Sequence, residues 1–65
     1  MKLIVNGETV ETEANSLAAL LAELGYKAEW IATAVNGEVV TAGHRQETPL
    51  AEGDRIEVLT PRQGG

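Results

Sequence analysis

Hydrophobic and polar residues alternate in short runs that turn-forming residues separate. Residues 1–5 read Met-Lys-Leu-Ile-Val and residues 8–12 read Glu-Thr-Val-Glu-Thr, with an Asn-Gly pair at 6–7 between them. Asn-Gly between two such runs is a strong hairpin signal, because both turn positions need a positive φ. A two-residue loop sets Leu3 opposite Val10 on one face. This hairpin therefore has an apolar face that another element must cover.

An amphipathic helix is predicted directly after the hairpin. Four leucines within residues 17–24 stand at i, i+3, i+4 and i+7, and alanines, which favour helices, fill most of the remaining positions. Asn15 or Ser16 can cap the start of this helix, and Gly25 can end it in a left-handed turn. The leucine face is the expected cover for the hairpin.

A second hairpin and a final strand complete the pattern. Residues 31–35 form a third strand and end in another Asn-Gly pair, which leads into residues 38–41. A polar stretch at 42–48 follows, and residues 55–60 form the last strand. Pro61 lacks the N–H that a strand ladder needs, so pairing should stop there.

These elements predict an α+β fold in which one mixed sheet of four to five strands wraps one helix. The hairpin, the helix and the last strand bury their apolar faces best when the last strand lies beside the first and parallel to it. That arrangement is the β-grasp, or ubiquitin-like, fold. We expect a β-grasp domain over residues 1–60 and a flexible C-terminal tail over 61–65. The strand residues expected to face the helix are Leu3, Val5, Val10, Leu50, Ile56 and Val58.

Composition and charge exclude several classes of function. The 65 residues include 10 acidic and 5 basic ones, a net charge of −5, and a net anion repels the phosphates of nucleic acid. No apolar run is long enough to predict a membrane span. Cysteine is absent, which removes disulfides, thiolate nucleophiles and cysteine-based zinc sites. We expect a cytoplasmic protein that is a monomer when free and binds neither nucleic acid nor membrane.

No set of side chains suggests catalysis or metal binding. His44 is the only histidine, and it lies in a polar stretch next to Arg45, so we interpret it as a solvent-exposed loop residue. The carboxylates are scattered, without the spacing of a metal-binding loop. Tyr26 and Trp30, the only aromatic residues, are expected to close one end of the core.

The end of the sequence is the best candidate for chemistry. Gly64 and Gly65 carry no side chains, and a carboxylate follows them directly. ATP can convert a carboxylate into an acyl-adenylate, which a sulfur nucleophile can then attack. Five residues from Pro61 onward span at most about 16–18 Å, enough to reach into the active site of another protein. The alternative is an inert, flexible end.

Five features in this order resemble one family over essentially the whole chain. They are the strand at 1–5, the helix at 17–24, Ala34-Val35-Asn36-Gly37, the turn Leu50-x-x-Gly53-Asp54-x-Ile56, and the final Gly64-Gly65. Together they resemble the ThiS family, the sulfur carriers of thiamin biosynthesis. The small subunit of molybdopterin synthase shares this fold and tail but is usually longer, so it remains an alternative.

The resemblance implies a carrier that is a protein co-substrate and not an enzyme. An E1-like adenylating enzyme using ATP and Mg would activate the Gly65 carboxylate. A cysteine desulfurase-linked donor would supply sulfur for a C-terminal thiocarboxylate, and thiazole synthase would draw that sulfur into the thiazole ring. The carrier itself would bind no cofactor, and Arg62, Gln63 and Gly64 would thread the partner's channel.

The sheet face away from the helix is the expected docking surface. Ile4 and Leu59 should point to this face from two neighbouring central strands, with Ala32 and Ala34 near them. We interpret these four residues as a shallow apolar patch for the adenylating enzyme and thiazole synthase. Scattered surface apolar residues are the simpler alternative.

Two functions of other classes remain open at this stage. A ubiquitin-like modifier would be joined to target lysines through Gly65, and an interaction domain would keep its activity without Gly64 and Gly65.

Overall fold

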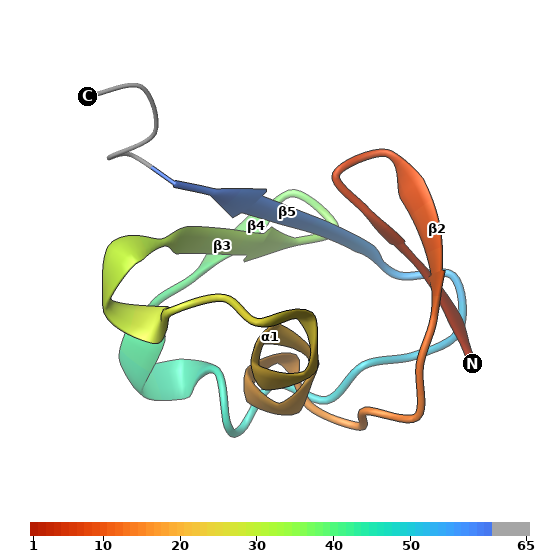
Figure 1. Ribbon diagram of the computed structural model, residues 1–65, viewed down its shortest axis with the longest axis horizontal. Coiled ribbons are helices and arrows are strands. Elements are labelled where there is room, and N and C mark those ends of the chain that lie inside the picture. Colours follow the sequence, from red (N-terminus) through yellow and green to blue (C-terminus); the bar gives the residue numbers. More distant parts are fainter. Residues whose placement is uncertain (61–65) are drawn as a thin grey trace.

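The computed structural model describes residues 1–60, which form a five-stranded mixed sheet packed against one helix (Figure 1). The strands lie in the order β2-β1-β5-β3-β4, with β1 and β5 parallel and every other neighbouring pair antiparallel. The predicted arrangement, with the last strand parallel to the first and beside it, is confirmed. The strands are β1 (Lys2–Val5), β2 (Glu8–Glu11), β3 (Ala32–Val35), β4 (Glu38–Val40) and β5 (Arg55–Leu59), and the helical elements are α1 (Leu17–Leu24) and the 3-10 turns η1 (Ala28–Trp30) and η2 (Ala42–His44).

Both Asn-Gly pairs form the predicted two-residue turns. Asn6 and Asn36 each have a φ of 51°, and the glycines that follow them have φ of 83° and 86°. Positive φ at both turn positions matches the right-handed twist of the flanking strands. The first hairpin has the predicted register, with Leu3 opposite Val10. The strands are slightly shorter than predicted, since β2, β4 and β5 each end one residue earlier and β3 begins one residue later.

The helix α1 has both of its predicted ends. Ser16 Oγ accepts a hydrogen bond of 3.2 Å from the Ala19 N–H, and Gly25 has a φ of 85° in the left-handed region. Leu24, in the last turn, is partly exposed, whereas the other three leucines are fully inside. The core is one cluster made of Leu3, Val5, Leu17, Leu20, Leu21, Ile56 and Val58, with Val10 and Leu50 packed against it.

The polar segment around η2 contains a buried arginine that the sequence analysis did not predict. Arg45 is only 4% exposed. Its guanidinium donates to the carbonyls of Ala28 and Ile31, at 2.9 Å each, and to Thr33 Oγ1 at 3.1 Å. Its own carbonyl accepts a hydrogen bond from the Ala18 N–H at 3.1 Å. One residue thereby ties η1, β3 and α1 together, with carbonyl and hydroxyl oxygens around its charge.

The two aromatic residues differ in burial. Tyr26 packs partly buried against the core, whereas Trp30 is 43% exposed. The prediction that Trp30 closes one end of the core is therefore wrong. The buried guanidinium of Arg45 binds the carbonyls of Ala28 and Ile31 on either side of Trp30, so it takes the interior position at this point.

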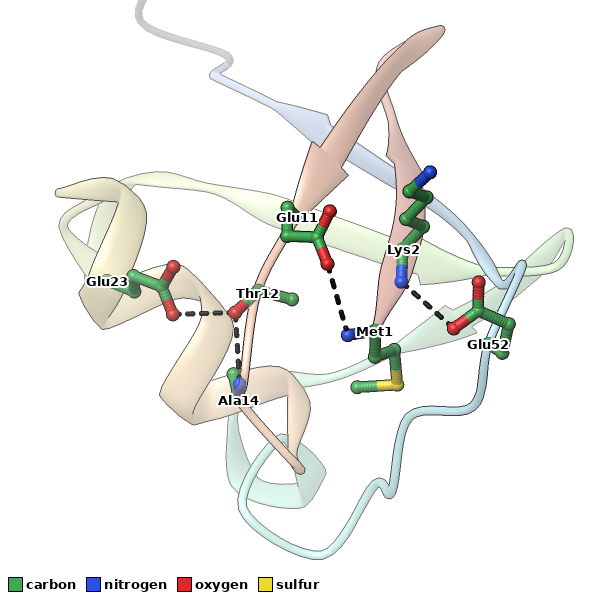
Figure 2. A network of polar contacts seen from close by, with 7 residues as sticks. All are labelled: Met1, Lys2, Glu11, Thr12, Ala14, Glu23 and Glu52. Atoms are coloured by element: carbon green, nitrogen blue, oxygen red, sulfur yellow. Dashed lines mark hydrogen bonds and ion pairs between the residues drawn. The ribbon is translucent and has the colours of Figure 1, made fainter.

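A group of polar contacts secures the connection between the first hairpin and the helix (Figure 2). The buried Thr12 hydroxyl donates to Glu23 Oε1 at 2.6 Å and accepts from the Ala14 N–H at 3.0 Å. On the other side of the network, Glu52 Oε1 accepts from the Lys2 N–H at 3.0 Å. These contacts hold the chain on both sides of β1 and thereby fix α1 and the turn before β5 relative to the sheet.

Candidate functional site

The strand β5 leads to the C-terminal segment and lies in the middle of the sheet, between β1 and β3 (Figure 1). Its side chains alternate. Ile56 and Val58 are buried beneath α1, whereas Arg55, Glu57 and Leu59 are exposed on the opposite face. The predicted tail residues Arg62, Gln63, Gly64 and Gly65 lie outside the described residues, so their roles remain predictions.

An apolar groove runs beside the end of β5 on the face away from α1. Leu59 is 67% exposed and pairs in register with Ala32, while Ala34 pairs with Glu57. Val39 of β4 is 77% exposed and forms the far side. The groove has a volume of about 230 Å³ and is lined by Ala32, Thr33, Ala34, Gly37, Val39, Glu57 and Leu59. Three of the four residues of the predicted patch lie in this groove.

Ile4, the fourth residue of that patch, lies in a separate hollow. Its register partner is Arg55, at the opposite end of β5 from Leu59. This second hollow, of about 380 Å³, is lined by Ile4, Gly7, Arg55, Ile56 and Glu57. Glu57 lines both hollows, so a carboxylate stands between Ile4 and Leu59. The four residues of the predicted patch are therefore divided between two hollows, and their role in docking remains a prediction.

Sequence reasoning missed Val39 as a surface residue. The signal was present, because consecutive residues of a strand point to opposite faces and Val39 is followed by Val40. One of these two valines has to point away from the core. Val40 packs against the core, and Val39 is left in the groove.

The side chain of Asn6 binds the main chain of β5 near its end. Asn6 Nδ2 donates to the Val58 carbonyl at 3.2 Å, and Asn6 Oδ1 accepts from the Val58 N–H at 2.9 Å. The backbone N–H of Asn6 donates to the Ile56 carbonyl at 2.9 Å. Since β1 ends at Val5, the carboxamide continues the pairing of β1 with β5 after the chain has turned away.

The second Asn-Gly turn binds the other end of the same strand. Asn36 Oδ1 accepts from the Arg55 N–H at 3.0 Å, and Asn36 Nδ2 donates to Asp54 Oδ1 at 3.0 Å. Its backbone N–H donates to the Arg55 carbonyl at 2.8 Å. An amide suits both positions, because it offers a donor and an acceptor on one short side chain. The repeated Val-Asn-Gly-Glu sequence thus makes two turns that hold β5 at its two ends.

The described residues show no arrangement of side chains that could perform catalysis. His44 is exposed, as predicted, and its Nδ1 lies 2.8 Å from Thr41 Oγ1. Within residues 1–60, no group of three or more His, Asp or Glu residues could hold a metal ion. No helix in this range is long and apolar enough to cross a membrane.

The order of the sheet, its single covering helix and the groove beside the strand that leads to the C-terminus define a small β-grasp protein of the ubiquitin-like class. Residues 3–65 match the ThiS family, and the chain belongs to that family.

Known relatives agree with this assignment in both sequence and structure. The chain is 33% identical over 61 residues to the sulfur carrier protein ThiS of Thermus thermophilus, covering 94% of this chain and 95% of that protein. A crystal structure of the thiamine biosynthesis protein ThiS from Geobacter metallireducens is similar over all of both chains, with 30% identity and a TM-score of 0.84. A solution structure of a Geobacter metallireducens thiamine biosynthesis protein covers all of this chain and 88% of that one, with 30% identity and a TM-score of 0.80.

Membership of this family makes the chain a sulfur carrier protein of thiamin biosynthesis and not an enzyme. Sequence reasoning left the small subunit of molybdopterin synthase as an alternative. The family match identifies the chain as the thiamin carrier instead.

Proposed function

We propose that the sulfur is carried on Gly65 as a C-terminal thiocarboxylate. The observation that carries this proposal is the absence of cysteine from the sequence of a sulfur carrier. Without a thiol, the chain cannot hold transferable sulfur as a side-chain persulfide. A carboxylate at the end of the main chain can exchange an oxygen atom for sulfur once it is activated, and Gly65 ends the sequence.

The proposed reaction takes place in the active sites of partner enzymes. In the E1-like adenylating enzyme, the Gly65 carboxylate attacks the α-phosphate of ATP, with Mg present, and pyrophosphate leaves. A sulfide equivalent from a cysteine desulfurase-linked donor then displaces AMP and leaves the thiocarboxylate. Thiazole synthase takes the sulfur for the thiazole ring and returns the carboxylate. The carrier contributes the reacting atoms of its own C-terminus and binds no cofactor.

The groove is the proposed docking surface for both enzymes. A partner that draws in the C-terminal segment must approach the end of β5, and Leu59 forms a wall of the groove at that end. Arg62, Gln63 and Gly64 then occupy the channel that leads to the active site. An apolar anchor of the partner fits between Leu59 and Val39, the most exposed large apolar residues described. Glu57 at the margin of the groove favours a basic residue beside that anchor.

We also propose where the carrier acts and in which oligomeric state. The proposed site of action is the cytoplasm, where ATP is available and where a chain without disulfides needs no oxidising compartment. We further propose that the free carrier is a monomer, since the groove is then open to either enzyme. The net charge of −5 disfavours nucleic acid as a partner.

Intact-mass spectrometry tests this function directly. The protein is incubated with ATP, Mg, an E1-like adenylating enzyme of the thiamin pathway and a sulfide source. We expect a mass gain equal to the replacement of one oxygen atom by one sulfur atom, located in the C-terminal peptide. A variant lacking Gly64 and Gly65, shown by circular dichroism to be folded, should gain no mass. An unchanged mass of the full chain would contradict the proposal, and conjugates to lysine side chains would indicate a protein modifier instead.

A further inference from the structure

The end of β5 extends beyond the strand that pairs with it on one side. The last register pair of β1 with β5 is Val5 with Ile56, after which the chain turns away at Asn6. On the other side, β3 continues to pair with β5 as far as Leu59. The final three residues of β5, Glu57, Val58 and Leu59, therefore have a strand neighbour on one side only.

Val58 is the residue that this asymmetry affects. Alternate residues of a strand direct their N–H and C=O groups to opposite sides. Since Val58 directs both groups toward Asn6, those of Leu59 point to β3, where Ala32 is its register partner. The β3 strand cannot replace Asn6 as a partner for Val58. The Asn6 carboxamide is thus what holds the main chain of Val58 on the β1 side.

We propose that Asn6 is a positioning residue for the reaction at the C-terminus. This inference rests on the function proposed above. By binding both backbone groups of Val58, Asn6 keeps Leu59 in the wall of the groove and gives the C-terminal segment a fixed starting point. Without these two hydrogen bonds, two-sided pairing of β5 ends at Ile56, and the final residues of the strand must be ordered each time a partner binds.

Without the Asn6 hydrogen bonds, the final residues of β5 become ordered only when the partner binds, and this ordering weakens binding. Once the partner has taken up the C-terminal segment, its channel supplies the alignment. Loss of the Asn6 hydrogen bonds should therefore raise the KM of the adenylating enzyme for the carrier and leave kcat unchanged.

Asn36 provides a matched control within the same chain. It has the same φ of 51° as Asn6, is also followed by glycine, and also binds the main chain of β5. It acts on Arg55, at the end of β5 that is far from the C-terminus. Replacing either asparagine by glycine keeps the turn, because glycine adopts positive φ readily, and removes only the carboxamide.

The experiment compares N6G, N36G and the unchanged chain. With ATP, Mg and a sulfide source present, steady-state release of pyrophosphate by a purified E1-like adenylating enzyme gives KM and kcat for each carrier. Thermal unfolding gives Tm, and amide hydrogen exchange reports on Val58. We expect both variants to lose similar amounts of Tm. Only N6G should show faster exchange at Val58 and a KM raised about tenfold, the change expected for one or two lost hydrogen bonds. The KM of N36G should stay within about twofold of the unchanged chain, because it keeps the pairing of Val58.

A third variant, N6D, keeps the result interpretable if N6G does not fold. Its carboxylate still accepts from the Val58 N–H but has no donor for the Val58 carbonyl, so its KM should lie above that of the unchanged chain. Equal KM values for N6G and the unchanged chain would overturn the role of Asn6, and so would equal increases in N6G and N36G. Failure of the unchanged chain to form a thiocarboxylate would instead contradict the proposed function. The exchange rate of Val58 does not depend on that reaction, so it would still show whether Asn6 holds the end of β5.

Discussion

Arg45 Nε donates a hydrogen bond of 3.1 Å to Thr33 Oγ1, and the same hydroxyl donates to the Val40 carbonyl at 2.7 Å. Both Arg45 and Thr33 are buried, and Thr33 also lines the groove on the other side of the sheet. These two hydrogen bonds, from Arg45 to Thr33 and from Thr33 to Val40, therefore support the β3–β4 part of the groove from the interior. A buried charged residue thereby helps to shape the surface that the proposed partners bind.

Replacement of Arg45 by alanine should strongly destabilise the fold. The change leaves the buried carbonyls of Ala28 and Ile31 without their donors, and we expect the free energy of unfolding to fall by about 3 kcal/mol. Chemical denaturation of the two proteins measures this difference. Arg55→Ala, at an exposed arginine, serves as the control and should change stability by less than about 0.5 kcal/mol. If Arg45→Ala lowered the free energy of unfolding no more than Arg55→Ala, the stabilising role of the Arg45 hydrogen bonds would be contradicted.

Truncation of Leu59 should weaken docking without unfolding the carrier. Leu59→Ala removes the exposed wall of the groove, and we expect the Kd for the adenylating enzyme to rise about tenfold, as for an interface anchor. Calorimetric titration measures the affinity, and a thermal scan of the free variant checks its fold. Ile4→Ala is the informative comparison, because Ile4 lies beyond Glu57 in the other hollow. An equal loss in both variants would mean that the partner covers the whole face.

The two enzymes should compete for the carrier. In the proposed cycle one groove and one C-terminal segment serve both enzymes, so adding thiazole synthase should raise the apparent Kd of the adenylating enzyme in proportion to the concentration of thiazole synthase. Fluorescence anisotropy of a carrier labelled on the helix side measures this shift. Sedimentation that shows all three proteins in one complex would exclude a shared docking surface.

Loss of the Thr12 hydroxyl should destabilise the connection between the first hairpin and the helix. Thr12→Val leaves the Ala14 N–H and Glu23 without their shared partner, and we expect a loss of about 1–2 kcal/mol in the free energy of unfolding. Thr9→Val, at an exposed position of β2, has the same change of side chain and should be nearly neutral. Indistinguishable stabilities of the two variants would contradict this assignment.

Local rules were sufficient to predict the turns, the helix and the core. Asn-Gly requires positive φ at both positions, which set the register of the first hairpin. The leucine spacing and Gly25 gave the bounds of α1, because caps and periodicity act over a few residues. Parallel pairing of β1 with β5 followed from the need to bury Leu3 and Ile56 under one helix.

The sequence alone could not predict features that depend on how distant segments of the chain align with one another. The offset between Ile4 and Leu59 depends on how β1 aligns with β5, and alternation along each strand does not determine that alignment. Arg45 looks like any charged loop residue, since its partners are backbone carbonyls, which every residue carries.

The placement of β5 has a mechanical consequence. In the proposed cycle a partner draws the C-terminus into its active site, and a pull along the axis of β5 would act on a strand that is flanked by β1 and β3. The ladder bonds on both sides run across that axis, so the pull loads them in shear, all together, and does not open them one after another as in peeling. The domain is thus suited to resist a force along β5 from the proposed partners.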